Sequence, residues 1–221
     1  ITSSKLLARM YISHSGILLY LPDDETTSER IYRRLLRCII SLKRNEFLAG
    51  SSDVYLYKIS KPMNIYLIRH TSVDVPAGYA YGQTDVPLKP TFEEEAEEVK
   101  KGLSDHTFDK VWTSPLTRCV RLANYCGFPE AEREDRIKEV NFGEWEMKSW
   151  NELSSDPRSE AWFKDWVNNP TPNGESLQDQ YDRVSDFLNE LRKSELQKVC
   201  LFAHGGVLTC ARVYAGEYPL Q

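Results

Sequence analysis

The stretch that most constrains the fold is residues 64–71, an apolar run that stops abruptly in Arg69 and His70. A short run of β-branched, aromatic and aliphatic residues predicts a strand buried on both faces. Sheets of α/β proteins bind ligands just beyond the carboxyl ends of their strands. An arginine there is costly to bury without a partner, so we expect a bound anion to complete its surroundings.

A second stretch repeats this arrangement. Residues 198–206 form another apolar run, which ends in His204 and is followed by two glycines. Between the two, a strand that ends near Thr113 leads into a predicted helix with Ser114 as N-cap, Pro115 at the first helical position and Arg118 in the first turn. The sequence therefore delivers two imidazoles and two guanidinium groups to strand ends.

Four motifs stand out along the chain: LIRHT at 67–71, SPLTRC at 114–119, EVNFGEWE at 139–146 and AHGG at 203–206. Together they resemble the histidine phosphatase superfamily, also called phosphoglycerate mutase-like. The resemblance extends from Met63 to the end of the chain and implies an α/β three-layer sandwich with a mainly parallel central sheet flanked by helices. Residues 82–88 and 142–146 look most like the α-ribazole phosphatases of cobalamin assembly.

The resemblance implies a metal-independent hydrolysis of phosphate monoesters through a phosphohistidine. His70 is then the nucleophile, since an ordinary imidazole is largely unprotonated at neutral pH. Arg69 and Arg118 bind the phosphoryl oxygens through planar, permanently charged forks. His204 is expected beside His70 as a cationic or hydrogen-bonding phosphate ligand. Glu139 is the candidate general acid and, in the second step, the base.

The assignment of Glu139 has two competitors in the same motif, Glu144 and Glu146. Glu139 is preferred because it stands four residues before Gly143, which is the spacing of the superfamily's proton donor.

The loop after the first strand, residues 72–85, is rich in turn formers and aromatic residues and is expected to line the substrate pocket. Thr71 and Gln83 are predicted to bind substrate. Thr71 replaces the glycine that most often follows the catalytic histidine in the superfamily. This departure favours hydrolysis over the mutase reaction.

The charge and composition of the 221-residue chain narrow the function classes. A formal net charge of −5 argues against non-specific binding to nucleic acid, and no apolar run is long enough to span a bilayer. We expect a small phosphorylated metabolite as partner, and neither nucleic acid nor a membrane; the sequence leaves the oligomeric state open. Five cysteines without a CxxC pair and the absence of a signal-peptide pattern favour a cytoplasmic setting.

Three alternative functions stay open. Within the superfamily, the rivals are a phosphoglycerate mutase-like enzyme and a sugar-phosphate phosphatase. Outside enzymes, the rival is a phosphate-binding regulatory module without activity.

Two histidines and a glutamate are also a zinc ligand set, but Arg69 and Arg118 would repel a cation. We therefore predict neither a metal nor a cofactor.

The chain is expected to divide at Met63. Residues 1–62 carry 10 lysines and arginines against 6 acidic residues, with a predicted hairpin within 11–21 and an amphipathic helix over 28–47. This segment is either an accessory domain or an upstream stretch read into the same frame, since Met63 resembles an initiator. Residues 63–221 form the phosphatase domain. The superfamily continues with a further strand and helix, so we expect a C-terminal truncation.

Overall fold

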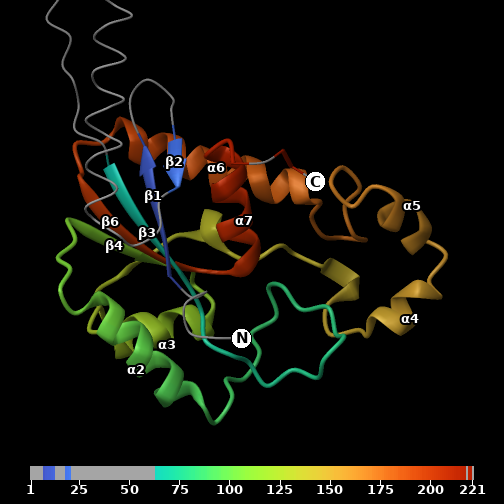
Figure 1. Ribbon diagram of the computed structural model, residues 1–221. Helices are drawn as coiled ribbons and strands as arrows, with labels where there is room; N and C mark the ends of the chain where they lie inside the picture. Colours follow the sequence, from blue (N-terminus) through green and yellow to red (C-terminus); the bar gives the residue numbers. More distant parts are fainter. Residues whose placement is uncertain (1–6, 13–17, 21–62, 218, 221) are drawn as a thin grey trace, which may run out of the picture.

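The computed structural model describes residues 7–12, 18–20, 63–217 and 219–220. They build one sheet in the order β2-β1-β3-β6-β4-β5, in which the last four strands are parallel to one another and β1 is antiparallel to both of its neighbours (Figure 1). The strands are β1 Leu7–Ile12, β2 Leu18–Tyr20, β3 Met63–Arg69, β4 Lys110–Thr113, β5 Glu132–Arg133 and β6 Lys198–Ala203.

The N-terminal segment is described only in part. The antiparallel pairing of β1 with β2 confirms the predicted hairpin, although β1 begins earlier than expected. β1 also pairs with β3 along its whole length, from Leu7 opposite Ile68 to Ile12 opposite Met63. The helix predicted over 28–47 lies outside the described residues. The division of the chain at Met63 stays a prediction.

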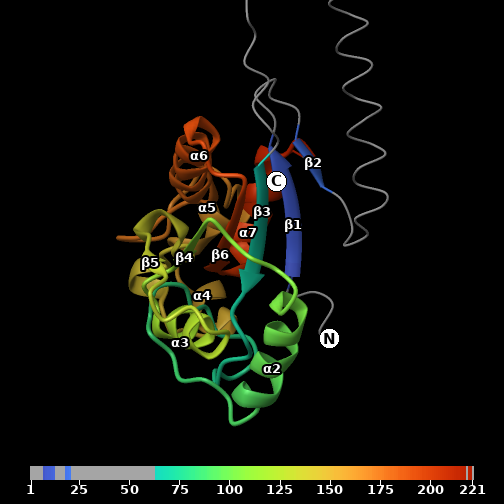
Figure 2. The same ribbon diagram turned by 90° about the vertical axis from the view of Figure 1, so that its left-hand side faces the viewer.

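Alternating side chains of the central strands supply two separate cores, because successive residues of a strand point to opposite faces. On one face, Tyr66 and Ile68 of β3 pack with Cys200 and Phe202 of β6. Two helices cover this face (Figure 2). They are α2 Phe92–Leu103 and α3 Thr117–Tyr125, which bury their apolar stripes against it.

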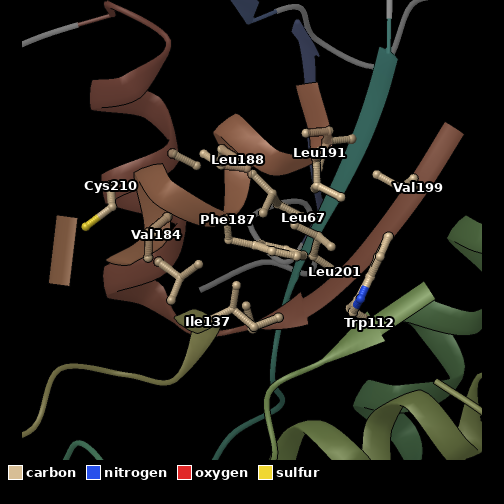
Figure 3. Close-up of a cluster of buried hydrophobic side chains, with 14 of the residues drawn as sticks. Leu67, Trp112, Ile137, Val184, Phe187, Leu188, Leu191, Val199, Leu201 and Cys210 are labelled. Carbon is tan, nitrogen blue, oxygen red and sulfur yellow. The ribbon is translucent and has the colours of Figure 1, made fainter. Parts of the chain in front are cut away.

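The opposite core is the larger one. Leu67 of β3 and Leu201 of β6 meet Phe187 there, and Trp112 packs edge-on against the Phe187 ring (Figure 3). The helices that cover this face are α6 Leu177–Lys193 and α7 Gly205–Tyr214. Helices on both faces of a mainly parallel sheet confirm the predicted three-layer sandwich.

The carboxyl ends of the central strands lie side by side. Arg69 is in register with Ala203, and the ladder continues past the strands because His70 N donates to Ala203 O (3.1 Å) and Ser114 N donates to Phe202 O (2.8 Å). The backbone therefore holds the residues after β3, β6 and β4 at one edge of the sheet.

The long connection between β5 and α6 reaches over this edge (Figure 1). It contains only short helical pieces, and its residues 147–150 pair with 78–80 of the loop after β3. The helical pieces are η2 Asp135–Ile137, η3 Gly143–Trp145, α4 Trp150–Ser154 and α5 Ser159–Lys164.

Among the described helices, none is both long and apolar enough to cross a membrane.

One local prediction was wrong, and one short strand was missed. The helix expected from Pro115 begins at Thr117, and Ser114 is not its N-cap; instead the Asp85 carboxylate accepts a hydrogen bond from Thr117 N (3.0 Å). A carboxylate at the N-terminus also suits the helix dipole. The strand β5 was not predicted, because its two exposed residues, Glu132 and Arg133, carry no apolar signal.

Candidate active site

His70 follows β3 directly and is almost completely buried, with 5% of its surface exposed. Its Nδ1 lies 2.7 Å from Thr71 O. Because a carbonyl only accepts, Nδ1 carries the proton in the neutral ring and Nε2 keeps a lone pair. Burial lowers the pKa of His70 to about 3, with the Arg118 charge contributing in the same direction. His70 is therefore a neutral imidazole at physiological pH, with its nucleophilic nitrogen unprotonated.

His204 follows β6 and is fully buried, with its ring centroid 5.2 Å from that of His70. Arg118 Nε lies 3.3 Å from its Nδ1, and its Nε2 lies 2.8 Å from Ser114 Oγ. An arginine only donates, so Nδ1 accepts and Nε2 donates to Ser114. Burial, followed by the charge of Arg118, lowers the pKa of His204 well below its usual value. Both histidines are thus held neutral in defined tautomers.

Arg118 is the buried cation of the site, with no exposed surface. Besides its bond to His204, it donates Nη1–H to Thr84 O (3.0 Å) and Nη2–H to Gly82 O. Of its five N–H groups, these three have acceptors in the described part of the chain, which leaves two for a ligand. A buried guanidinium compensated by neutral carbonyls retains its full positive charge, and an anion is its natural ligand.

Arg69 differs from the expectation, since its side chain is exposed rather than buried. Arg69 is the last residue of β3, whereas the cation buried in the site is Arg118. The Arg69 guanidinium lies over the start of α7: a methyl group added at Gly205 would lie 3.6 Å from Arg69 Nε. Arg69 thus stands beside His204 and contributes to the electrostatic lowering of the His70 pKa.

Glu139 is half-buried and packs against the first turn of α7. Its Oε1 accepts hydrogen bonds from Gln180 Nε2 (2.9 Å) and Val140 N (3.0 Å), and its Oε2 accepts from Gly206 N (3.2 Å). The bond to Gly206 N places the Glu139 carboxyl group beside a residue that follows His204 by two positions. The geometry brings Glu139 to the same strand-end cluster as the two histidines.

The two competing glutamates are engaged elsewhere. Glu144 is exposed and pairs with Arg158, with 2.8 Å between Oε2 and Nη1. Glu146 accepts backbone N–H groups from Gly82, Gln83 and Phe142. Burial raises the pKa of Glu146, but the hydrogen bonds outweigh this effect and hold the pKa below its usual value. Both carboxylates are thus held in other contacts, whereas Glu139 binds Gly206 N beside His204, which favours Glu139.

The two residues predicted to bind substrate lie in different environments. Thr71 is 1% exposed, and its Oγ1 has no hydrogen-bond partner within the described residues. Gln83 is half-buried and donates Nε2–H to Glu139 O (3.1 Å). Gln83 therefore ties the loop after β3 to the backbone of the candidate acid.

Three functional neighbours were not identified from the sequence. Ser114 was interpreted as a helix cap, but contacts His204 instead. Gln180 contacts Glu139 and is 1% exposed on the otherwise apolar stripe of α6. A polar residue on that stripe was the sequence signal that could have identified it. Arg183 donates to the carbonyls of Lys138 (2.7 Å) and Glu139 (2.9 Å), and no local pattern marks it.

Within the described residues, no group of three or more histidine, cysteine, aspartate or glutamate side chains is arranged to hold a metal ion. The charged groups that converge with His70 and His204 are two guanidinium groups and one carboxyl group. This donor set suits a phosphate monoester, whose dianion the arginines neutralise.

Comparison with known proteins gives the same picture. The sequence profile of the histidine phosphatase superfamily (branch 1) matches residues 65–221. The adenosylcobalamin/alpha-ribazole phosphatase of Salmonella typhimurium is 29% identical over 66% of this chain and 76% of its own. Phosphoserine phosphatase 1 of Hydrogenobacter thermophilus is 30% identical over 64% of this chain and 71% of its own.

A similar solved structure is the alpha-ribazole phosphatase of Shigella flexneri. It superimposes with a TM-score of 0.63 at 28% identity, covering 67% of this chain and 77% of that one.

Proposed function

Because the chain belongs to branch 1 of the histidine phosphatase superfamily, we propose that it hydrolyses phosphate monoesters through a covalent phosphate on His70, without a metal ion. The observation that carries the proposal is the neutral, buried His70, whose Nδ1 is bound to Thr71 O and whose Nε2 keeps its lone pair beside the Arg118 cation.

In the first step, Arg69, Arg118 and His204 bind the nonbridging oxygens of the ester, and His70 Nε2 attacks phosphorus. A nitrogen–phosphorus bond forms as the bond to the ester oxygen breaks. The leaving alkoxide takes its proton from the Glu139 carboxyl group. The fixed donors stabilise the charge that spreads over the phosphoryl oxygens in the transition state.

In the second step, the Glu139 carboxylate accepts a proton from water, and the resulting hydroxide attacks phosphorus. The nitrogen–phosphorus bond breaks, phosphate leaves and His70 returns to its neutral form. The bond from Nδ1–H to Thr71 O matters in both steps, because it keeps the same nitrogen available for phosphorylation. His204, being neutral in the free enzyme, donates Nε2–H to the phosphate in place of Ser114.

For the substrate we propose α-ribazole 5′-phosphate, in cobalamin biosynthesis. The support is the similarity to relatives named alpha-ribazole phosphatases in both sequence and structure. A sugar-phosphate phosphatase and a phosphoglycerate mutase-like enzyme are the alternatives, and a regulatory module that binds phosphate without turnover is a further one.

The four cysteines of the described part are buried and free of disulfides, which supports a cytoplasmic setting.

The proposal is tested by phosphate release from a panel of monoesters that includes α-ribazole 5′-phosphate, phosphoserine and 3-phosphoglycerate, with a chelator present. We expect turnover that is highest for α-ribazole 5′-phosphate and is lost in His70→Ala. Turnover of other esters alone would keep the mechanism and reject this substrate. Transfer to a second hydroxyl without phosphate release would indicate the mutase.

A folded chain that releases phosphate from no ester would favour the regulatory module.

A further inference from the structure

We propose that Glu146 is a positioning residue that sets the orientation of the phosphate-binding Arg118 through the backbone of residues 82–84. This inference rests on the proposed function and adds a residue to it. Glu146 is not expected to touch the substrate. Its effect reaches the phosphate through a chain of hydrogen bonds, each of which the structure shows.

The first link is the carboxylate of Glu146. Its Oε2 accepts from Gly82 N (2.9 Å) and Thr84 N (3.2 Å), and its Oε1 accepts from Gln83 N (2.9 Å) and Phe142 N (3.0 Å). Three consecutive N–H groups of the loop thus converge on one side chain from a segment about sixty residues away. Bonds to a charged acceptor are roughly twice as strong as neutral ones, so the loop is held in one conformation.

The second link runs through carbonyl oxygens of the same three-residue stretch. Gly82 O and Thr84 O, whose own N–H groups bind Glu146, accept the two Nη–H groups of Arg118. A loop that shifted would carry both acceptors with it. The guanidinium plane is therefore fixed by the loop, since two of its edges are tied to this one turn of backbone.

The third link is the bond from Arg118 Nε to His204 Nδ1 (3.3 Å). It selects the tautomer in which His204 donates Nε2–H, so the loop also determines which nitrogen of His204 faces a phosphate oxygen. Catalysis is sensitive to such placement: a displacement of about 1 Å can cost on the order of a hundredfold in rate.

The close packing of the loop leaves it little freedom to adjust. A methyl group added at Gly82 would lie 1.8 Å from Val140 O and 2.9 Å from Glu146 Oε1. Only glycine permits this approach of the two backbone segments. Gln83 adds a further tie, because its Nε2–H donates to Glu139 O (3.1 Å).

The test is a double-mutant cycle on the full chain, because coupling between residues reveals which partner a positioning residue acts through. Glu146→Gln keeps the shape of the side chain, removes its charge and replaces one acceptor oxygen by an NH₂ group. It is measured alone, with Arg118→Lys and with Arg69→Lys. The lysine variants keep a charge but lose the planar fork. Glu144→Gln, two residues away on the exposed side, is the matched control.

We expect Glu146→Gln to lower kcat/KM for a turned-over ester by about tenfold, both alone and with Arg69→Lys, but by less than about twofold with Arg118→Lys. Glu144→Gln should stay within about twofold of the unmodified chain. The same loss in all three backgrounds would overturn the proposal, because it would indicate a structural role. No loss in any background would also overturn it.

Two further measurements keep the test decisive. Where Glu146→Gln does not fold, Glu146→Asp takes its place, because it keeps the charge but is one methylene too short to span both segments. Where the unmodified chain turns over no ester, the proposed function has failed, and calorimetric binding of tungstate replaces kcat/KM in the same cycle. The same pattern of coupling in tungstate affinity would support the relay; uncoupled losses, or no binding of tungstate at all, would overturn it.

Discussion

His70 and His204 are neutral because of where the fold holds them. Both rings are buried beside the fixed charge of Arg118, and a second charge on either ring would be repelled. The bond from His70 Nδ1 to Thr71 O fixes the tautomer of His70, and the bond from Arg118 Nε to His204 Nδ1 fixes that of His204. The sequence predicted both histidines at strand ends and a neutral His70, but it left His204 either cationic or neutral, because the pKa of His204 depends on burial and on Arg118, which is distant in the chain.

The lowered pKa of His70 predicts a dependence of stability on pH. In the unfolded chain His70 binds a proton below about pH 6.5, but in the folded chain only below about pH 3. The unfolded state therefore binds more protons between these values, and stability falls as the pH falls. The contribution is about 1.4 kcal/mol per pH unit, or about 2 kcal/mol between pH 7 and pH 5.

The measurement is urea unfolding of the wild-type chain and of His70→Asn at both pH values. We expect the wild-type protein to lose about 2 kcal/mol more than the variant as the pH is lowered. Equal losses would show that His70 titrates normally in the folded state.

Met147 adopts φ = 59°, a left-handed conformation that strains most side chains, and is 38% exposed. Glycine relieves this strain, so Met147→Gly should raise the free energy of unfolding by about 1 kcal/mol. Asn173, at φ = 55°, is the control, because asparagine tolerates this region. Asn173→Gly should therefore stabilise the chain less, with a smaller rise of the melting temperature in thermal unfolding than Met147→Gly. A destabilised Met147→Gly would contradict the strain argument.

At the scale of elements, the start of α7 shows how a helix can place a catalytic group. A methyl group added at Gly206 would lie 2.3 Å from Glu139 Oε1 and 2.7 Å from Gln180 Oε1, so neither side chain can keep its position. We expect Gly206→Ala to lower kcat by about a hundredfold while the chain stays folded.

Gly205→Ala is the matched control, since its added methyl group would meet nothing closer than Arg69 Nε at 3.6 Å, an ordinary contact. It should keep kcat within about twofold of the wild-type value. Steady-state kinetics and circular dichroism of both variants check this pair. Equal effects of the two substitutions would indicate that the helix, not Glu139, is disturbed.

Elements with an apolar period were predicted well, and their junctions were not. The strands β3 and β6 were expected within residues 64–71 and 198–206 and end at Arg69 and Ala203, because each is a short apolar run. The start of α3 was misplaced, because Asp85, from a loop thirty-two residues earlier, binds Thr117 N and frees Ser114 for His204. Local patterns contain no information about such a partner.

At the scale of the whole molecule, the three layers follow from two strands whose faces are both apolar. β3 and β6 send alternate residues into opposite cores, so helices must cover both sides of the sheet. The same pairing brings the ends of the strands, and with them His70 and His204, together. The network of Glu146, the 82–84 backbone and Arg118 was not predictable, because each of its bonds joins segments distant in the sequence.

The central claim is that phosphate passes through His70. The most direct measurement is a rapid quench in alkali, which preserves phosphohistidine, with a ³²P-labelled monoester, followed by peptide mapping of the labelled chain. We predict label on the peptide that contains His70 in the wild-type protein, more of it in Glu139→Gln, where water is no longer activated, and none in His70→Ala. Label that persists in His70→Ala, or turnover without any labelled enzyme, would contradict the account.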